Sequence, residues 1–104
     1  MPANHQDTRT FSGSRAEIVR ACESAVTQAG LRTTASNPET GQIEARSKMG
    51  MRSWGEIITI NVDAEGAVHI DSRCRGVQMV DYGKNRANIE KIFSALELLI
   101  PARP

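Results

Sequence analysis

Two short segments of the sequence combine residue types that can bind polar ligands or transfer protons. The first is Ser53-Trp54-Gly55-Glu56, and the second is Asp81-Tyr82-Gly83-Lys84-Asn85. Carboxylates, an ammonium group and aromatic rings are typical of ligand and partner sites. We therefore predict that the two segments meet as a pair of loops, and the functional hypothesis is a polar cleft between them. The candidate ligand- or partner-binding residues are Trp54, Glu56, Asp81, Tyr82, Lys84 and Asn85.

The same two segments also have a purely structural interpretation. Trp54 and Tyr82 could plug one end of a sheet, because aromatic side chains bury large apolar areas. Asp81 could cap the final helix, where a carboxylate suits the positive end of the helix dipole. Caps and aromatic plugs are common, so we favour this interpretation. A third hypothesis is a small enzyme in which Glu56, Asp81 and Lys84 form an acid–base group.

A second set of candidates is basic and belongs to predicted strands or their ends. These residues are Arg46, Lys48, Arg52, Arg73 and Arg75. A basic sheet face can bind nucleic acid, although such faces usually carry aromatic side chains for stacking on bases. Glu44, Glu56 and Asp71 dilute the positive charge of the predicted outer face. The sequence therefore favours a mixed, solvated face over a nucleic-acid-binding domain, which stays an alternative.

Composition excludes several classes of protein. The chain has 104 residues, 39% of them hydrophobic and 24% charged, which is typical of one globular domain. A net charge of +1 implies no general attraction to nucleic acid or to anionic membranes. No apolar run approaches the roughly 20 residues of a membrane span. His5 and His69 do not form a metal-binding spacing, and no nucleotide-binding motif is present, so we predict neither a metal nor a cofactor.

The two cysteines indicate a reducing compartment. Cys22 and Cys74 are 52 positions apart and belong to no CxxC or Cys/His motif. Disulfides are rare inside cells, so we expect two buried, reduced thiols in a cytoplasmic protein, with a structural disulfide as the alternative.

Hydrophobic periodicity and turn residues divide the chain into seven elements. We predict strands over residues 8–12, 31–36, 42–48, 54–63 and 68–75, a helix from the capping box Ser14-x-x-Glu17 to Gly30, and a helix over about 86–100. The final helix has an apolar stripe at helical spacing. Its members are Ile89, Ile92, Phe93, Leu96, Leu99 and Ile100. Residues 1–7 are expected to be a flexible tail, residues 8–100 one domain, and residues 101–104 a C-terminal tail.

This order predicts an α+β fold, β-α-β-β-β-β-α. Four consecutive strands joined by short turns form an antiparallel meander, and the first strand is expected to pair with the fifth at an edge. The result is a curved, five-stranded antiparallel sheet with both helices packed on one face. At the level of the fold this order resembles the TATA-box-binding-protein-like and helix-grip architectures.

The two candidate segments also carry a resemblance. The SWGE run at 53–56 and the DYGKN run at 81–85 resemble small bacterial proteins of unknown function that share an SWGE-like motif and a D-W/Y-G-K-N motif. Asp71-Ser72-Arg73, together with Asp81-x-Gly83-x-Asn85, is similar to part of a second bacterial family of unknown function. The resemblance covers about residues 41–98. It implies a bacterial protein and no particular reaction.

The sequence therefore favours a non-catalytic binding or protein-interaction module, with its surface around Trp54 and Tyr82. A nucleic-acid-binding domain and a small enzyme are the alternatives. The expected partner is a protein or a small ligand, with no membrane involved. We expect a monomer or a weak homodimer, because Ile57 and Thr59 could pair two sheets face to face.

Overall fold

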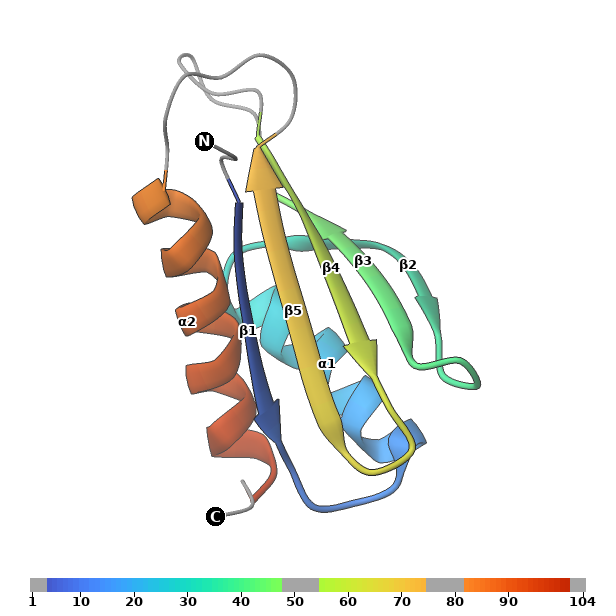
Figure 1. Cartoon of the computed structure of the whole chain (residues 1–104). Coiled ribbons are helices and arrows are strands. Elements are labelled where there is room, and N and C mark those ends of the chain that lie inside the picture. The colour runs from blue at the N-terminus through green and yellow to red at the C-terminus, as the bar shows by residue number, and fades with distance from the viewer. Residues whose placement is uncertain (1–3, 48–54, 75–81, 102–104) are drawn as a thin grey trace.

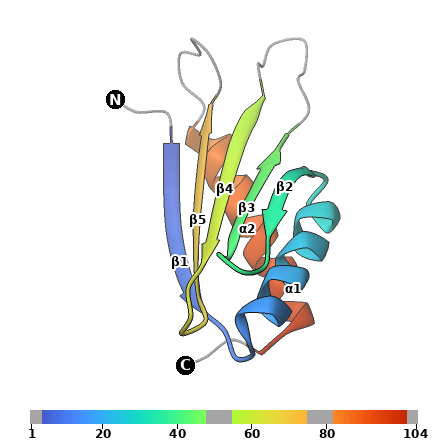
Figure 2. The same cartoon turned by 90° about the vertical axis from the view of Figure 1, so that its right-hand side faces the viewer.

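The computed structural model describes residues 4–47, 55–74 and 82–101, which form five strands and two helices (Figure 1). The elements are β1 (Asn4–Thr10), α1 (Arg15–Gln28), β2 (Arg32–Asn37), β3 (Gln42–Arg46), β4 (Glu56–Val62), β5 (Ala67–Cys74) and α2 (Tyr82–Leu99). The strands form one antiparallel sheet in the order β1-β5-β4-β3-β2, and both helices lie on the same face of it (Figure 1, Figure 2). The predicted α+β class, the element order and the pairing of the first strand with the fifth are confirmed.

Helix α1 begins and ends at the predicted residues. The Ser14 hydroxyl accepts the backbone N–H of Glu17, and the Glu17 carboxylate accepts the backbone N–H of Ser14, which is a capping box. These hydrogen bonds hold the pKa of Glu17 below its ordinary value. Gly30 then ends the helix with a φ of +82°, a conformation that favours glycine. The buried face of α1 consists of Ile18, Val19, Cys22, Ala25 and Val26.

Helix α2 begins at Tyr82, four residues before the predicted start at Arg86. The second predicted loop is therefore mostly the first turn of a helix. Glycine in a helix interior costs about 1 kcal/mol relative to alanine. Packing of the long apolar stripe on the sheet offsets this cost for Gly83.

Most of the predicted stripe of α2 is buried, namely Ile89, Ile92, Phe93 and Leu96. Leu99 belongs to the predicted stripe but is 43% exposed, so the stripe is not buried along its whole length. Each residue turns the helix by about 100°, which places Leu99 about 80° from Ile89, at the margin of the buried face. Ile100 returns to within about 20° of Ile89 and is partly buried against the core.

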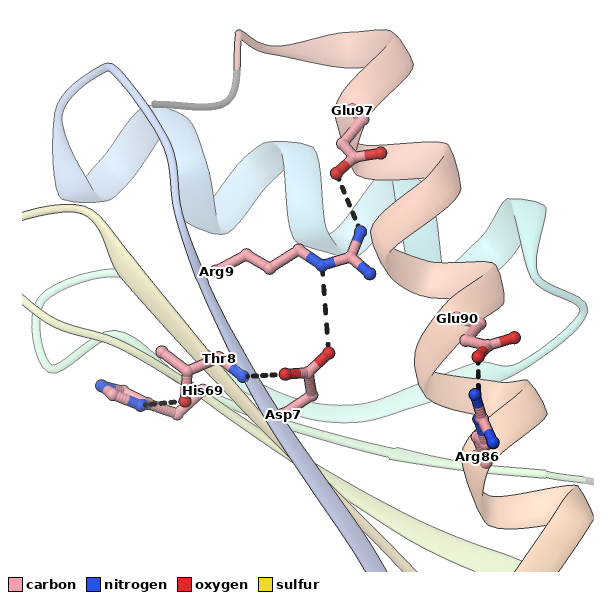
Figure 3. A network of polar contacts seen from close by, with 7 residues as sticks. All are labelled: Asp7, Thr8, Arg9, His69, Arg86, Glu90 and Glu97. Carbon is pink, nitrogen blue, oxygen red and sulfur yellow. Dashed lines mark hydrogen bonds and ion pairs between the residues drawn. The ribbon is translucent and has the colours of Figure 1, made fainter. Parts of the chain in front are cut away.

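Strand β1 begins at Asn4, so residues 4–7 of the predicted tail belong to the sheet. This edge strand has no apolar alternation, because its two core-side residues opposite Ile70 and Val68 are Asp7 and Arg9. The Arg9 guanidinium lies 4.6 Å from the centre of the Phe93 ring. It also lies 2.8 Å from the Glu97 carboxylate, as Figure 3 shows. Arg9 thereby covers the edge of the core with its stem and keeps its charge paired.

Candidate functional site

The predicted loop cluster is only partly within the described residues. Trp54 and Asp81 lie outside them. Tyr82, Lys84 and Asn85 belong to the first turn of α2, and their side chains lie outside the described part of the chain. Glu56 is the one candidate of this set whose side chain the structure describes, and it lies at the start of β4.

Glu56 faces the core, where we had expected it on the outer face of the sheet. It is 1% exposed, because it shares the inward parity of Ile58 and Ile60. The Ser47 hydroxyl donates to Glu56 Oε1 at 2.8 Å, and the Asn88 side-chain amide donates to the same oxygen at 3.2 Å. The prediction that Glu56 dilutes the charge of the outer face is therefore wrong.

Two further hydrogen bonds extend this buried group. The backbone N–H of Glu56 donates to the Ser47 hydroxyl at 2.7 Å, and the Asn88 amide lies 3.4 Å from the hydroxyl of the fully buried Ser72. We call Ser47, Glu56, Ser72 and Asn88 the inner polar cluster. It joins the ends of β4 and β5 and the residue after β3 to the N-terminal half of α2.

This arrangement favours a structural role for Glu56. A buried carboxylate is tolerated when hydrogen bonds satisfy it, and each such bond to a charged group contributes about 1.5–3 kcal/mol. Acid–base catalysis would require contact with a substrate, and a carboxylate that is 1% exposed offers little access to one. The other two members of the hypothetical acid–base group, Asp81 and the Lys84 side chain, lie outside the described residues.

The outer face at the same end of the sheet carries a row of basic residues. In the strand register Arg32 lies opposite Arg46, Arg46 opposite Ile57, and Ile57 opposite Arg73. Directly opposed residues of antiparallel strands point to the same face. We call these four residues, from β2, β3, β4 and β5, the arginine row. Arg46 and Arg73 were predicted for this face, whereas Lys48, Arg52 and Arg75 lie outside the described residues.

Sequence reasoning missed Arg32. Strand β2 is almost entirely exposed and has no apolar alternation that would show which of its residues face outward. The available signal was Leu31, the apolar residue just before the strand, because alternation from Leu31 to Thr33 places Arg32 on the opposite face.

The arginine row carries more positive charge than its surroundings neutralise. Like charges directly opposite each other on a sheet are destabilising, and Arg32 faces Arg46 in this way. Arg46 has one acidic neighbour, Glu44, at 3.6 Å, and its Nε is shielded from solvent without a hydrogen-bond partner among the described residues. Within the same residues, Arg32 and Arg73 form no ion pair. Oxygen acceptors on another molecule could satisfy the exposed guanidinium groups of Arg32 and Arg73.

A second row lies next to the arginine row and has the opposite sign. Glu44 lies opposite Thr59, and Thr59 opposite Asp71. These residues are two positions along each strand from the arginine row, a separation of about 6.6–6.8 Å. We call Glu44, Thr59 and Asp71 the acidic row. None of the described residues on this face is a phenylalanine, tyrosine or tryptophan.

Further along the outer face, Thr8, His69 and Asp63 form a short polar series. The Thr8 hydroxyl lies 2.9 Å from His69 Nδ1 (Figure 3), and His69 Nε2 lies 3.7 Å from Asp63 Oδ2. Asp63 Oδ1 accepts the backbone N–H groups of Ala67 and Glu65, which together with His69 lower the pKa of Asp63. A hydroxyl, an imidazole and a carboxylate in series resemble a catalytic triad, but the His69 side chain is 50% exposed. We therefore interpret the series as contacts that hold the turn between β4 and β5 and connect His69 to β1.

Residues 4–47, 55–74 and 82–101 contain no group of three or more His, Cys, Asp or Glu side chains placed to hold a metal ion. Neither helix formed by these residues is long and apolar enough to cross a membrane. Compared with protein-family models and with curated proteins, the chain has no significant match.

Proposed function

We propose that this chain is a non-catalytic protein-interaction module that binds an acidic segment of its partner on the open face of the sheet. The observation that carries the proposal is the strand register, which aligns three arginines and one isoleucine across four neighbouring strands. Opposing like charges weaken the fold slightly, and carboxylates of a partner would relieve that repulsion. The arginine row is thus better explained by binding than by stability.

The composition of the face favours a protein partner over a nucleic acid. Ile57 lies between Arg46 and Arg73, and an apolar side chain flanked by arginines is typical of protein interfaces. The described part of this face offers no aromatic side chain on which the bases of a nucleic acid could stack. Its phosphates would also approach the carboxylates of Glu44 and Asp71 in the acidic row.

Fluorescence polarisation tests the proposal with two labelled probes, an oligoglutamate peptide and a single-stranded oligonucleotide. We expect the wild-type chain to bind the peptide with an affinity that falls as salt is added. The double variant Arg46→Ala/Arg73→Ala should lose at least about tenfold in affinity. Arg86→Ala is the matched control, because Arg86 is an exposed arginine of α2 that pairs with Glu90 (Figure 3).

The control variant should bind like the wild type. The double variant removes two charges and the control removes one. If Arg86→Ala lost half or more of the binding free energy lost by the double variant, the peptide would sense only net charge, and the proposal would fail. Tighter binding of the oligonucleotide, lost in the double variant, would instead support the nucleic-acid alternative.

A further inference from the structure

The spacing of the arginine row specifies the shape of what it can bind. Neighbouring strands in a sheet are about 4.8 Å apart. Counted from Arg73 across β4, β3 and β2, the other three members of the row therefore lie at about 4.8, 9.6 and 14.4 Å. A partner that engages the whole row must present its side chains on one side with nearly this repeat.

We propose that the occupant of the arginine row is an amphipathic α-helix that crosses strands β5 to β2. Its acidic residues lie at positions i, i+7 and i+10, and an apolar residue lies at i+3. Position i faces Arg73, i+3 faces Ile57, i+7 faces Arg46 and i+10 faces Arg32. This inference rests on the proposed function and adds the conformation and the sequence pattern of the partner.

Helix geometry matches the row in both distance and direction. With a rise of 1.5 Å per residue, positions i+3, i+7 and i+10 lie at about 4.5, 10.5 and 15.0 Å along the axis, within about 1 Å of the row. A turn of about 100° per residue keeps all four positions within a sector of about 80°. The sheet twist rotates successive strands by about 20–25°, and the long, flexible stems of the arginines can follow this rotation.

An extended peptide matches the row less well. Its side chains return to the same face every two residues, which is about 6.7 Å. One such step overshoots Ile57 by about 2 Å, and the next step overshoots Arg46 by about 4 Å. An extended segment would therefore leave the centre of the row without its partners, so the geometry favours a helix.

Two further features orient the partner helix. Arg32 and Arg46 are adjacent, so positive charge is densest over β2 and β3. The C-terminus of a helix carries a partial negative charge, which favours this end of the row and places the N-terminus over β5. The acidic row lies on one flank, so basic residues on that flank of the helix would gain, and a helix acidic all round would be rejected.

Three labelled peptides of about 20 residues, long enough for an alanine-rich helix to form, test the inference. The first carries acidic residues at i, i+7 and i+10 and leucine at i+3. The second has the same composition with its acidic residues distributed around the helix. The third equals the first except for two central prolines, which prevent a helix. Circular dichroism reports the helicity of each peptide, and polarisation reports its affinity.

We expect the first peptide to bind at least about tenfold more tightly than the other two. Its advantage should disappear in Arg32→Ala/Arg46→Ala and persist in the control Arg86→Ala. Ile57→Ala should weaken the first peptide severalfold, since the helix of that peptide places its leucine over position 57.

The other outcomes separate this inference from the proposed function. Equal binding of all three peptides, lost in Arg32→Ala/Arg46→Ala, would overturn the helix and leave the acidic-partner proposal standing. If the proline peptide bound as tightly as the first peptide while the second bound weakly, the partner would be an extended segment, and the helix would also be overturned. If no peptide bound in a way that depends on the arginines, both proposals would fail.

Discussion

The two faces of the sheet carry charged groups in opposite settings at the same strand ends. On the inner face, Glu56 is buried and held by Ser47 and Asn88. On the outer face, the arginine row presents three cations, two of them directly opposed. The two groups are back to back, because Ser47 follows Arg46, Glu56 precedes Ile57, and Ser72 precedes Arg73.

This difference separates what the fold needs from what a partner needs. A chain that supplies several donors to one buried carboxylate gains stability and a fixed geometry from it. Two arginines that face each other across neighbouring strands do not stabilise the fold, so their contribution is expected in binding. Substitutions on the inner face should therefore change stability, and substitutions in the arginine row should change affinity.

The largest effect is expected for Ile60→Ala on the inner face. Ile60 is fully buried in β4, and truncating such a residue costs about 3 kcal/mol through lost burial and the cavity left behind. Its chain neighbour Asn61 faces outward, so Asn61→Ala is the control and should change the free energy of unfolding by no more than about 0.5 kcal/mol. Urea unfolding measures both, and similar losses would abolish the distinction between the faces.

The next effect concerns the inner polar cluster. Glu56→Ala removes the acceptor for the Ser47 hydroxyl and the Asn88 amide, and should cost about 2 kcal/mol. Glu56→Gln keeps the size and one acceptor oxygen, so it should lose less. If the unfolding midpoint of Glu56→Ala matched that of the wild type, the cluster would have no structural role.

Alkaline pH tests the inner face through Cys22. Burial raises the pKa of this thiol to about 12, above the value of about 9 expected in the unfolded chain. Its contribution to stability is therefore full below about pH 9 and is lost as the pH rises from there toward 12. Between about pH 8 and pH 10.5, the wild type should lose on the order of 2 kcal/mol more than Cys22→Ala. Parallel pH profiles of the two proteins would contradict the burial of the thiol.

The smallest change in stability is expected in the arginine row, with the opposite sign. Arg32→Glu converts a like-charged pair with Arg46 into an oppositely charged pair, and should stabilise the protein by about 0.5 kcal/mol at low salt. The same variant should bind acidic peptides much more weakly. Arg32→Ala, which only removes the repulsion, should gain less. A loss of stability in Arg32→Glu would show that Arg32 supports the fold.

Alternation along the strands was sufficient to predict much of this two-sided arrangement. It placed Ile60 and Ser72 inward and Arg73 outward, as observed. The same alternation places Glu56 inward, but its charge suggested the outer face. The hydrogen-bond donors that make burial tolerable come from Ser47 and Asn88, and the position of Asn88 depends on how α2 packs on the sheet.

Register and element ends were less accessible from the sequence. Strand β2 has an irregularity between Thr33 and Ala35, so simple alternation puts Ala35 on the wrong face. The opposition of Arg32 and Arg46 follows from pairing between strands, which local residue preferences do not encode. Tyr82 was expected in a loop before a helix over about 86–100, although the suggested Asp81 cap would already have started that helix at Tyr82. Packing further along the helix outweighs the local cost of Gly83.

The pairing of β1 with β5 has a consequence for how the molecule assembles. Strand β1 precedes the other four strands in the chain, yet its partner residues in β5 follow about 60 residues later. The meander from β2 to β5 consists of neighbours in the chain and can form beforehand, so closing the sheet with β1 is expected to be a late event in folding. Until that event, β5 is an open edge, and another molecule's strand could occupy it. Pairing of β1 is therefore expected to remove the sheet edge at which aggregation could begin.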